Sequence, residues 1–141
     1  MRAADRTAPR QASEREAAWW QSLEELRSRF ERELTHQLTR LGLSPSAYGA
    51  LEQLATHPSG LKVTELARHI RLSPSSTSRV VERLVRDGLV ERRPGPHDRR
   101  TVHGRITDPG RALYETARPA HRRALAHALD AGPTGLVALA D

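Results

Sequence analysis

Hydroxyl and guanidinium groups gather at two places in the middle of this sequence. The first group lies on one short stretch and consists of Ser73, Ser75, Ser76, Ser78, Arg79 and Arg83. The second is the run Asp98-Arg99-Arg100. Guanidinium groups bind phosphate oxygens and guanine edges bidentately, and small hydroxyls can hydrogen-bond to phosphates or bases without steric hindrance. The two groups therefore favour contact with nucleic acid.

Nothing in the sequence is typical of catalysis or of a bound cofactor. No serine stands in a nucleophile elbow, and no glycine-rich phosphate loop precedes a helix. Seven histidines invite a metal site, but His121 and His127 are six residues apart and not the four that place two ligands on one helix face. There is no cysteine, which excludes disulfides and thiol chemistry. We expect no enzyme activity, no cofactor and no metal.

The first polar group needs a helix, and the sequence predicts one over residues 74–87. Ser73 is a good N-cap, Pro74 suits the first helical position, and Gly88 suits the position after the last turn. Apolar spacing of three and four predicts a buried stripe made of Thr77, Val80, Val81, Leu84 and Val85. The serines and arginines then occupy the open face, and its N-terminal part suits the major groove of DNA.

The flanking segments complete a winged helix. A short helix over 65–70, capped by Thr64, precedes the turn at residues 71–73, which is the helix-turn-helix arrangement. Two strands, at residues 89–93 and 102–106, flank a rigid basic loop over 94–100. Residues 61–63 are expected to add a third short strand to this wing.

Charge follows the same pattern. The formal net charge is +6, and residues 43–107 hold eleven basic and six acidic side chains, so +5 of it lies there. A basic helix-turn-helix is the electrostatic footprint of a nucleic-acid binder. Every one of these bases except Lys62 is arginine. Recognition would explain that bias, but the codon preference of a GC-rich genome explains it as well.

Both ends of the chain predict long helices that a small winged helix cannot cover. The first runs over 13–41, with a stripe at helical spacing formed by Trp20, Leu23, Phe30, Leu34, Leu38 and Leu41. The second runs over 108–129, capped by Thr107 and kinked at Pro119. Its expected inner face consists of Ala112, Leu113, Thr116, Ala120, Ala124, Leu125 and Ala128. A last short helix is expected over 134–140.

Three regions follow from this organisation. Residues 1–12 are polar, without periodicity, and expected to be disordered. Residues 13–42 and 108–141 form a helical dimerisation region, and residues 43–107 form the winged helix-turn-helix. The predicted fold class is mainly α with a small β-wing, in which both chain ends build the dimerisation lobe.

Several short motifs, taken together, resemble the MarR family of bacterial transcriptional regulators from about Trp20 to Leu129. They are Gly42-Leu43-Ser44, Thr64-Glu65-Leu66-Ala67, Leu72-Ser73, Val81-Glu82-Arg83-Leu84, Gly88-Leu89-Val90-Glu91-Arg92, Asp98-Arg99-Arg100 and Ile106-Thr107 with Gly110. The resemblance implies a homodimeric repressor that binds near-palindromic double-stranded DNA and is released by a small molecule. It also implies that Asp98 holds the Arg100 guanidinium. Gly104 departs from the family's branched apolar residue, so a weak or bulged second strand is expected.

A small-molecule site and the location of the protein are also predicted. Trp19, Trp20 and Tyr48 could line a pocket for an aromatic or anionic ligand, which the resemblance implies, or they could simply pack in the core or an interface. No apolar run is long enough for a membrane span, and no signal sequence is recognisable, so we expect a cytoplasmic protein without membrane contact. The alternative function is a winged-helix module for protein assembly or RNA contact, without specific DNA binding.

Overall fold

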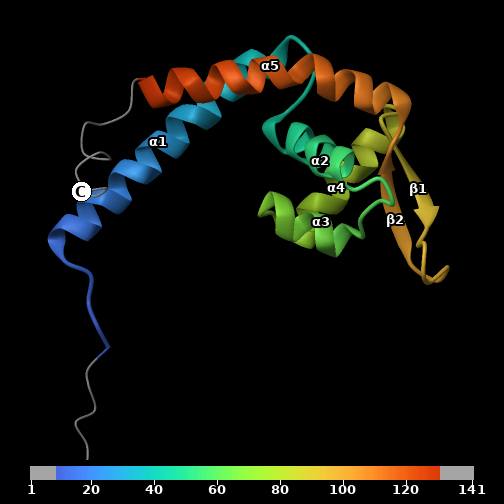
Figure 1. The fold of residues 1–141 in the computed structure, drawn as a ribbon, viewed down its shortest axis with the longest axis horizontal. Helices are drawn as coiled ribbons and strands as arrows, with labels where there is room; N and C mark the ends of the chain where they lie inside the picture. The colour runs from blue at the N-terminus through green and yellow to red at the C-terminus, as the bar shows by residue number, and fades with distance from the viewer. Residues whose placement is uncertain (1–8, 131–141) are drawn as a thin grey trace, which may run out of the picture.

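The computed structural model describes residues 9–130, which fold into a lobe with two long helices extending from it. The described elements are α1 (Glu14–Thr39), α2 (Pro45–Thr56), α3 (Val63–Ile70), α4 (Pro74–Arg86), β1 (Val90–Pro94), β2 (Val102–Ile106) and α5 (Asp108–Asp130). In Figure 1, α2, α3, α4 and the strands form the lobe, and α5 leads from the strands over the lobe to α1. The helix expected at residues 134–140, and most of the N-terminal segment expected to be disordered, lie outside the described residues.

Side-chain caps fix where four of the helices begin. Before α1, Ser13 Oγ accepts from the amide of Glu16 at 3.2 Å, and the Glu16 carboxylate accepts from the Ser13 amide at 2.7 Å. The predicted caps of α4 and α5 are confirmed, since Ser73 and Thr107 each accept from the amide three residues later at 3.1 Å. Ser44 caps α2 in the same way, also at 3.1 Å. Each cap satisfies a backbone donor that the first helical turn leaves free.

The start of α3 differs from the prediction. The helix begins at Val63, and Lys62 rather than Thr64 occupies the N-cap. The Lys62 amide donates to the Glu65 carboxylate at 3.0 Å, so a side chain inside the helix supplies the acceptor. This also removes most of the third strand expected at residues 61–63. Only Leu61 pairs with the wing, through two backbone hydrogen bonds to Gly104 at 3.0 and 2.9 Å.

The wing is a regular antiparallel hairpin. Its register runs without interruption from Val90 opposite Ile106 to Pro94 opposite Val102. The bulge expected at Gly104 is therefore wrong. Gly104 faces Arg92 in β1, while its own N–H and C=O bond to Leu61 on the other side.

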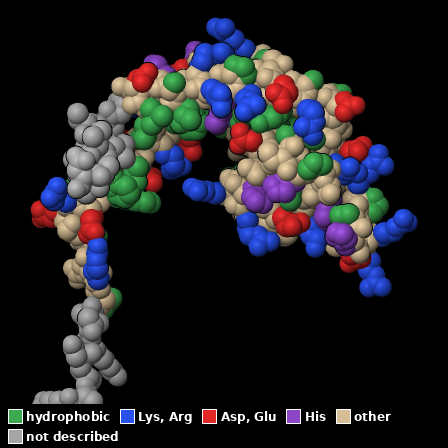
Figure 2. All heavy atoms as spheres, in the orientation of Figure 1, with side chains coloured by type: hydrophobic (Ala, Val, Ile, Leu, Met, Phe, Trp, Pro, Cys, Tyr) green, Lys and Arg blue, Asp and Glu red, His purple; other side chains and the backbone are tan. Residues whose placement is uncertain are grey.

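The two long helices pack against each other and leave an apolar surface uncovered. Only Leu34 and Leu38 of the predicted α1 stripe are buried, and Trp20 is 59% exposed. Figure 2 shows hydrophobic side chains gathered where α1 and α5 meet, facing the hollow between these helices and the lobe.

The buried face of α5 is only partly the predicted one. Ala120, Ala124 and Ala128 are buried as expected. Ala112, Thr116 and Leu125 are exposed, and the buried positions that the prediction missed are Gly110, Tyr114 and Ala117. The helix continues through Pro119, whose side chain is exposed. The whole buried face of α5 thus includes a tyrosine at the lobe and small residues further along.

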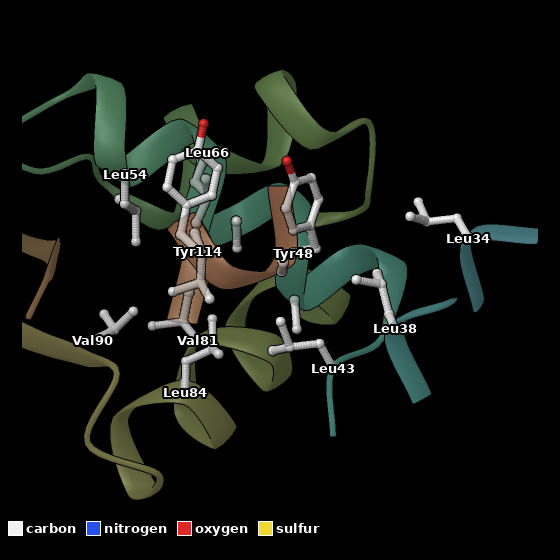
Figure 3. Close-up of a cluster of buried hydrophobic side chains, with 14 of the residues drawn as sticks. Leu34, Leu38, Leu43, Tyr48, Leu54, Leu66, Val81, Leu84, Val90 and Tyr114 are labelled. Carbon is white, nitrogen blue, oxygen red and sulfur yellow. The ribbon is translucent and has the colours of Figure 1, made fainter. Parts of the chain in front are cut away.

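One hydrophobic core joins the lobe to the long helices (Figure 3). Each element of the lobe contributes buried side chains, which include Tyr48, Leu54, Leu66, Val81, Leu84 and Val90. Tyr114 of α5 and Leu38 of α1 enter the same cluster. Burying one such leucine or valine stabilises a fold by roughly 1.5–3 kcal/mol, so this packing fixes α4 relative to α5.

A close backbone approach ties the start of α5 to the start of the wing. A Cβ at Gly110 would overlap the carbonyl oxygen of Leu89, so this contact requires glycine. Beside it, the Thr107 amide donates to Leu89 O at 3.1 Å, and Thr107 Oγ1 donates to Gly88 O at 2.7 Å. We call these four residues, Gly88, Leu89, Thr107 and Gly110, the α5–β1 seam.

Candidate nucleic-acid interface and adjoining groove

The outer face of α4 is polar and open. Thr77, Val81 and Leu84 turn inward and are buried, which leaves the opposite side of the helix to solvent. The predicted contact residues Ser75, Arg79 and Arg83 are exposed, and Ser76 and Ser78 are half-buried. The exposed Ser73 Oγ is engaged in capping and lies 3.2 Å from Ser75 Oγ. The structure thus brings the first polar group together on one helix.

A small cavity connects this face with the beginning of α2. It has a volume of about 250 Å³ and lies between the turn around Ser44 and the side of α4 that carries Arg79 and Arg83. Asp87 lines the same cavity. The sequence did not predict this neighbourhood, because the approach of α2 to α4 depends on packing between distant segments.

The tip of the wing is closed by backbone hydrogen bonds. Asp98 Oδ1 accepts from the Arg100 amide at 3.0 Å, and the carbonyl oxygen of Asp98 accepts from the Thr101 amide and hydroxyl at 3.1 and 2.8 Å. A Cβ at Gly95 would overlap the Thr101 hydroxyl, so the base of the tip also needs glycine. Arg99 and Arg100 stay exposed beyond this turn.

The expected link between the Asp98 carboxylate and the Arg100 guanidinium is wrong for this structure. Asp98 acts on the backbone of Arg100, and the described residues contain no ion pair between the two side chains. Short loops with aspartate favour this geometry because the carboxylate reaches an amide two residues ahead. The only ion pair on the wing in the described part joins Arg93 and Glu91, with Nε and Oε1 3.0 Å apart.

A large groove of about 860 Å³ lies between the lobe and the long helices. Trp20 and Phe30 of α1, Tyr48 of α2 and Leu125 of α5 line it, together with the turn between α3 and α4. Trp20 and Tyr48 are therefore brought to one groove, as predicted. Trp19 is half-buried elsewhere on α1 and does not line it, so its placement in the pocket is wrong.

Aromatic contacts join three helices beside this groove. The His121 ring of α5 stacks on Tyr48 with centroids 4.7 Å apart, and the Phe30 and His121 rings form a T-shaped contact with centroids 5.3 Å apart. Burial lowers the pKa of His121, with the Arg122 charge adding to the effect and Glu52 opposing it. Tyr48 Oη donates to Glu52 Oε2 at 3.2 Å, and burial raises the pKa of this phenol.

The turn that leads into α4 holds an unusual backbone conformation. Arg71 has φ 58° and ψ 41°, and it is the only described residue other than glycine with a positive φ. This left-handed conformation costs a side chain that carries Cβ about 1–2 kcal/mol. The sequence predicted a turn at Arg71 but contained no signal for this conformation, which glycine would adopt more readily.

Other types of site find no support in the described residues. Between residues 9 and 130, no group of three or more histidine or acidic side chains could hold a metal ion. No helix in the same part of the chain is long and apolar enough to cross a membrane.

An exposed polar helix face beside a basic hairpin, carried on a helix-turn-helix, defines a winged helix-turn-helix DNA-binding protein. Comparison with known proteins narrows this class. The family model described as "MarR family" matches residues 41–101. The repressor Rv2887 of Mycobacterium tuberculosis is 33% identical over 97 residues, which are 69% of each chain. This chain belongs to the MarR family, whose members are transcriptional regulators and not enzymes.

Two further relatives define how far the likeness extends. The MarR family regulator Sco3205 of Streptomyces coelicolor, solved in complex with DNA, superposes with a TM-score of 0.75 at 32% identity, covering 91% of this chain and 82% of Sco3205. The repressor MdtR of Bacillus subtilis is 30% identical over 94 residues, which span 67% of this chain and 60% of MdtR. The match to MdtR therefore leaves a substantial part of that protein without a counterpart.

Proposed function

We propose that the protein is a homodimeric transcriptional repressor that binds a near-palindromic DNA operator and is released by a small ligand. The observation that carries the proposal is the open face of α4, with Ser75, Arg79 and Arg83 exposed beside a wing that ends in Arg99 and Arg100. Figure 2 shows basic side chains around that wing. Serine and arginine on a recognition helix read base edges, while wing arginines suit the narrow, electronegative minor groove.

Three relatives support the DNA-bound and repressor parts of the proposal. Sco3205 was solved in complex with DNA, and Rv2887 and MdtR are named transcriptional repressors. The dimer is supported by the uncovered apolar surface on α1 and α5, where Trp20 and Leu129 are 59% and 56% exposed. A second copy would cover that surface and provide the second recognition helix that a palindrome requires.

The groove supports the ligand part of the proposal. Its walls carry Trp20, Phe30 and Tyr48, and it lies between the lobe that meets DNA and the helices that would meet the partner. A ligand there can favour one arrangement of these two parts over the other, which is what release requires. Rv2887 was solved in complex with p-aminosalicylic acid, so an aromatic acid is the ligand class to test first.

Footprinting on the gene's own promoter, combined with binding titrations over a range of salt concentrations, tests the proposal. We expect protection of two half-sites about 10 base pairs apart and an affinity that falls steeply with salt.

Arg79→Ala should weaken operator binding by about 1–3 kcal/mol if a base edge is read. Arg15→Ala, an exposed arginine at the far end of α1, serves as the charge-matched control. Protection of one half-site, or binding indifferent to salt, would overturn the proposal.

A further inference from the structure

Arg71 has a left-handed backbone conformation that favours glycine, so the presence of an arginine at this position needs an explanation. The Arg71 amide donates to the carbonyl oxygen of Ala67. The Leu72 amide donates to the same oxygen at 3.1 Å, and these hydrogen bonds end α3. Glycine makes this closure without the clash between Cβ and the carbonyl oxygen, and Gly42 and Gly88 have a positive φ after the ends of α1 and α4. Where a residue with a charged side chain holds a strained backbone conformation, the side chain is a candidate for a function.

Arg71 lines the large groove and is exposed. The groove has one other arginine, Arg27, which is already neutralised by Glu31 at 2.9 Å and Glu24 at 3.3 Å. The ion pairs between described residues do not include Arg71. Arg71 is therefore the guanidinium of this groove that is left to bind an anion.

The surroundings of Arg71 restrict the anion that fits. Ile70 and Leu72 stand on either side of it, and the aromatic rings of Trp20 and Phe30 also line the groove. The carboxylate of Glu52 lies in the same groove and would repel an anion close to it. The geometry points to a monoanion with a large apolar body, whose charged end lies at Arg71 and whose body contacts the aromatic walls.

We propose that Arg71 recognises the carboxylate of an aromatic carboxylic acid bound in the groove, and thereby couples the ligand to α4. Arg71 stands two residues before Ser73, the N-cap of α4, so a ligand held by its guanidinium acts on the turn that positions this helix. The proposal rests on the ligand part of the proposed function but not on DNA binding. Planar guanidinium groups bind carboxylates bidentately, which fixes orientation as well as charge.

Direct binding of 2-naphthoate and its neutral analogue 2-naphthamide to the full chain tests this proposal. Calorimetry, or quenching of tryptophan fluorescence, measures both affinities without DNA, so a failure to bind DNA would not affect the result. The parent should bind naphthoate more tightly than naphthamide. Arg71→Gly should lose about tenfold or more of the naphthoate affinity, a typical loss for a charge-assisted pair, and leave the naphthamide affinity unchanged.

The same variant separates recognition from a structural role. Because glycine relieves the left-handed strain, Arg71→Gly should unfold at the same temperature as the parent or a higher one. Arg71→Lys keeps the charge without the planar fork and should fall between the parent and Arg71→Gly. Arg68→Ala removes an exposed arginine of α3 that does not line the groove, so it is the matched control and should bind naphthoate as the parent does. Equal naphthoate affinity in the parent and Arg71→Gly, or no preference of the parent for the acid over the amide, would overturn the proposal.

Discussion

At the scale of single residues, Asp98 shows how an acid can shape a loop that we propose contacts DNA. Its carboxylate accepts from the Arg100 amide at 3.0 Å and so holds the backbone that carries both tip arginines. Asp98→Ala should weaken operator binding by about 1 kcal/mol, the usual value of one hydrogen bond, although it raises the net charge by one. Arg100→Ala should weaken it more. Titrations at one salt concentration measure both effects.

A matched variant isolates the geometric role of this carboxylate. The substitution Asp98→Asn removes the negative charge but keeps an acceptor oxygen that can reach the Arg100 amide. This variant should therefore bind DNA at least as tightly as the parent. If Asp98→Ala binds more tightly than the parent as well, Asp98 is only an unfavourable charge near phosphate.

The sequence predicted which residues lie at the tip but not which atoms meet there. Asp98, Arg99 and Arg100 are adjacent in the chain, so their proximity needs no structure. Whether Asp98 bonds to a guanidinium or an amide depends on loop dihedrals, which the contact of Gly95 with Thr101 helps to set. Arg71 was missed for the same reason, since its significance comes from a positive φ and from the distant helices across the groove.

At the scale of elements, the α5–β1 seam depends on a missing side chain. Gly110→Ala adds a methyl group where Leu89 O already lies, so the first turn of α5 must move away from the wing. We expect a loss of about 1–3 kcal/mol in the free energy of unfolding, typical of overpacking, measured by urea denaturation. Gly49→Ala is the control, because its added Cβ would lie at an ordinary 3.6 Å from Ile70 Cγ2 within a helix.

The control should behave in the opposite direction. Alanine is favoured over glycine inside a helix by about 1 kcal/mol, so Gly49→Ala should leave stability unchanged or raise it. A Gly110→Ala variant as stable as the parent would mean that the seam can open without cost.

Element boundaries were predictable where their signals are local. Serine and proline at the starts of α2 and α4 act within one turn, and α4 begins where the sequence predicts. The start of α3 depends on Glu65 bonding back to Lys62, which no residue at the cap itself reveals. The buried face of α5 was only partly predicted, because small residues line more than one side of that helix. The contact between Gly110 and Leu89, which lie far apart in sequence, determines which of those sides is buried.

At the scale of the whole molecule, the uncovered apolar surface on α1 and α5 predicts self-association. Trp20, Leu125 and Leu129 are 59%, 41% and 56% exposed although large and hydrophobic. Sedimentation should show a dimer at micromolar concentration, and Leu129→Arg should weaken it by at least tenfold because a charge would be buried in the interface. Val102→Arg is the control, since Val102 is 57% exposed on the wing and should leave the dimer intact.

A stable, folded monomer of the parent at micromolar concentration would contradict this expectation. Equal weakening by the wing variant would show that a general rise in positive charge, and not the α1 and α5 surface, explains the effect.

The α5–β1 seam also means that the wing moves together with α5. The hydrogen bonds of Thr107 and the close contact of Gly110 hold the base of β1 against the start of α5. From Leu89 to Pro94 a strand extends about 17 Å at 3.4 Å per residue, and Arg99 and Arg100 lie beyond it. A rotation of α5 by about 10° would therefore swing the tip by about 3 Å, or half the width of the minor groove. A ligand that tilts this one helix slightly needs no unfolding to carry the arginines out of reach.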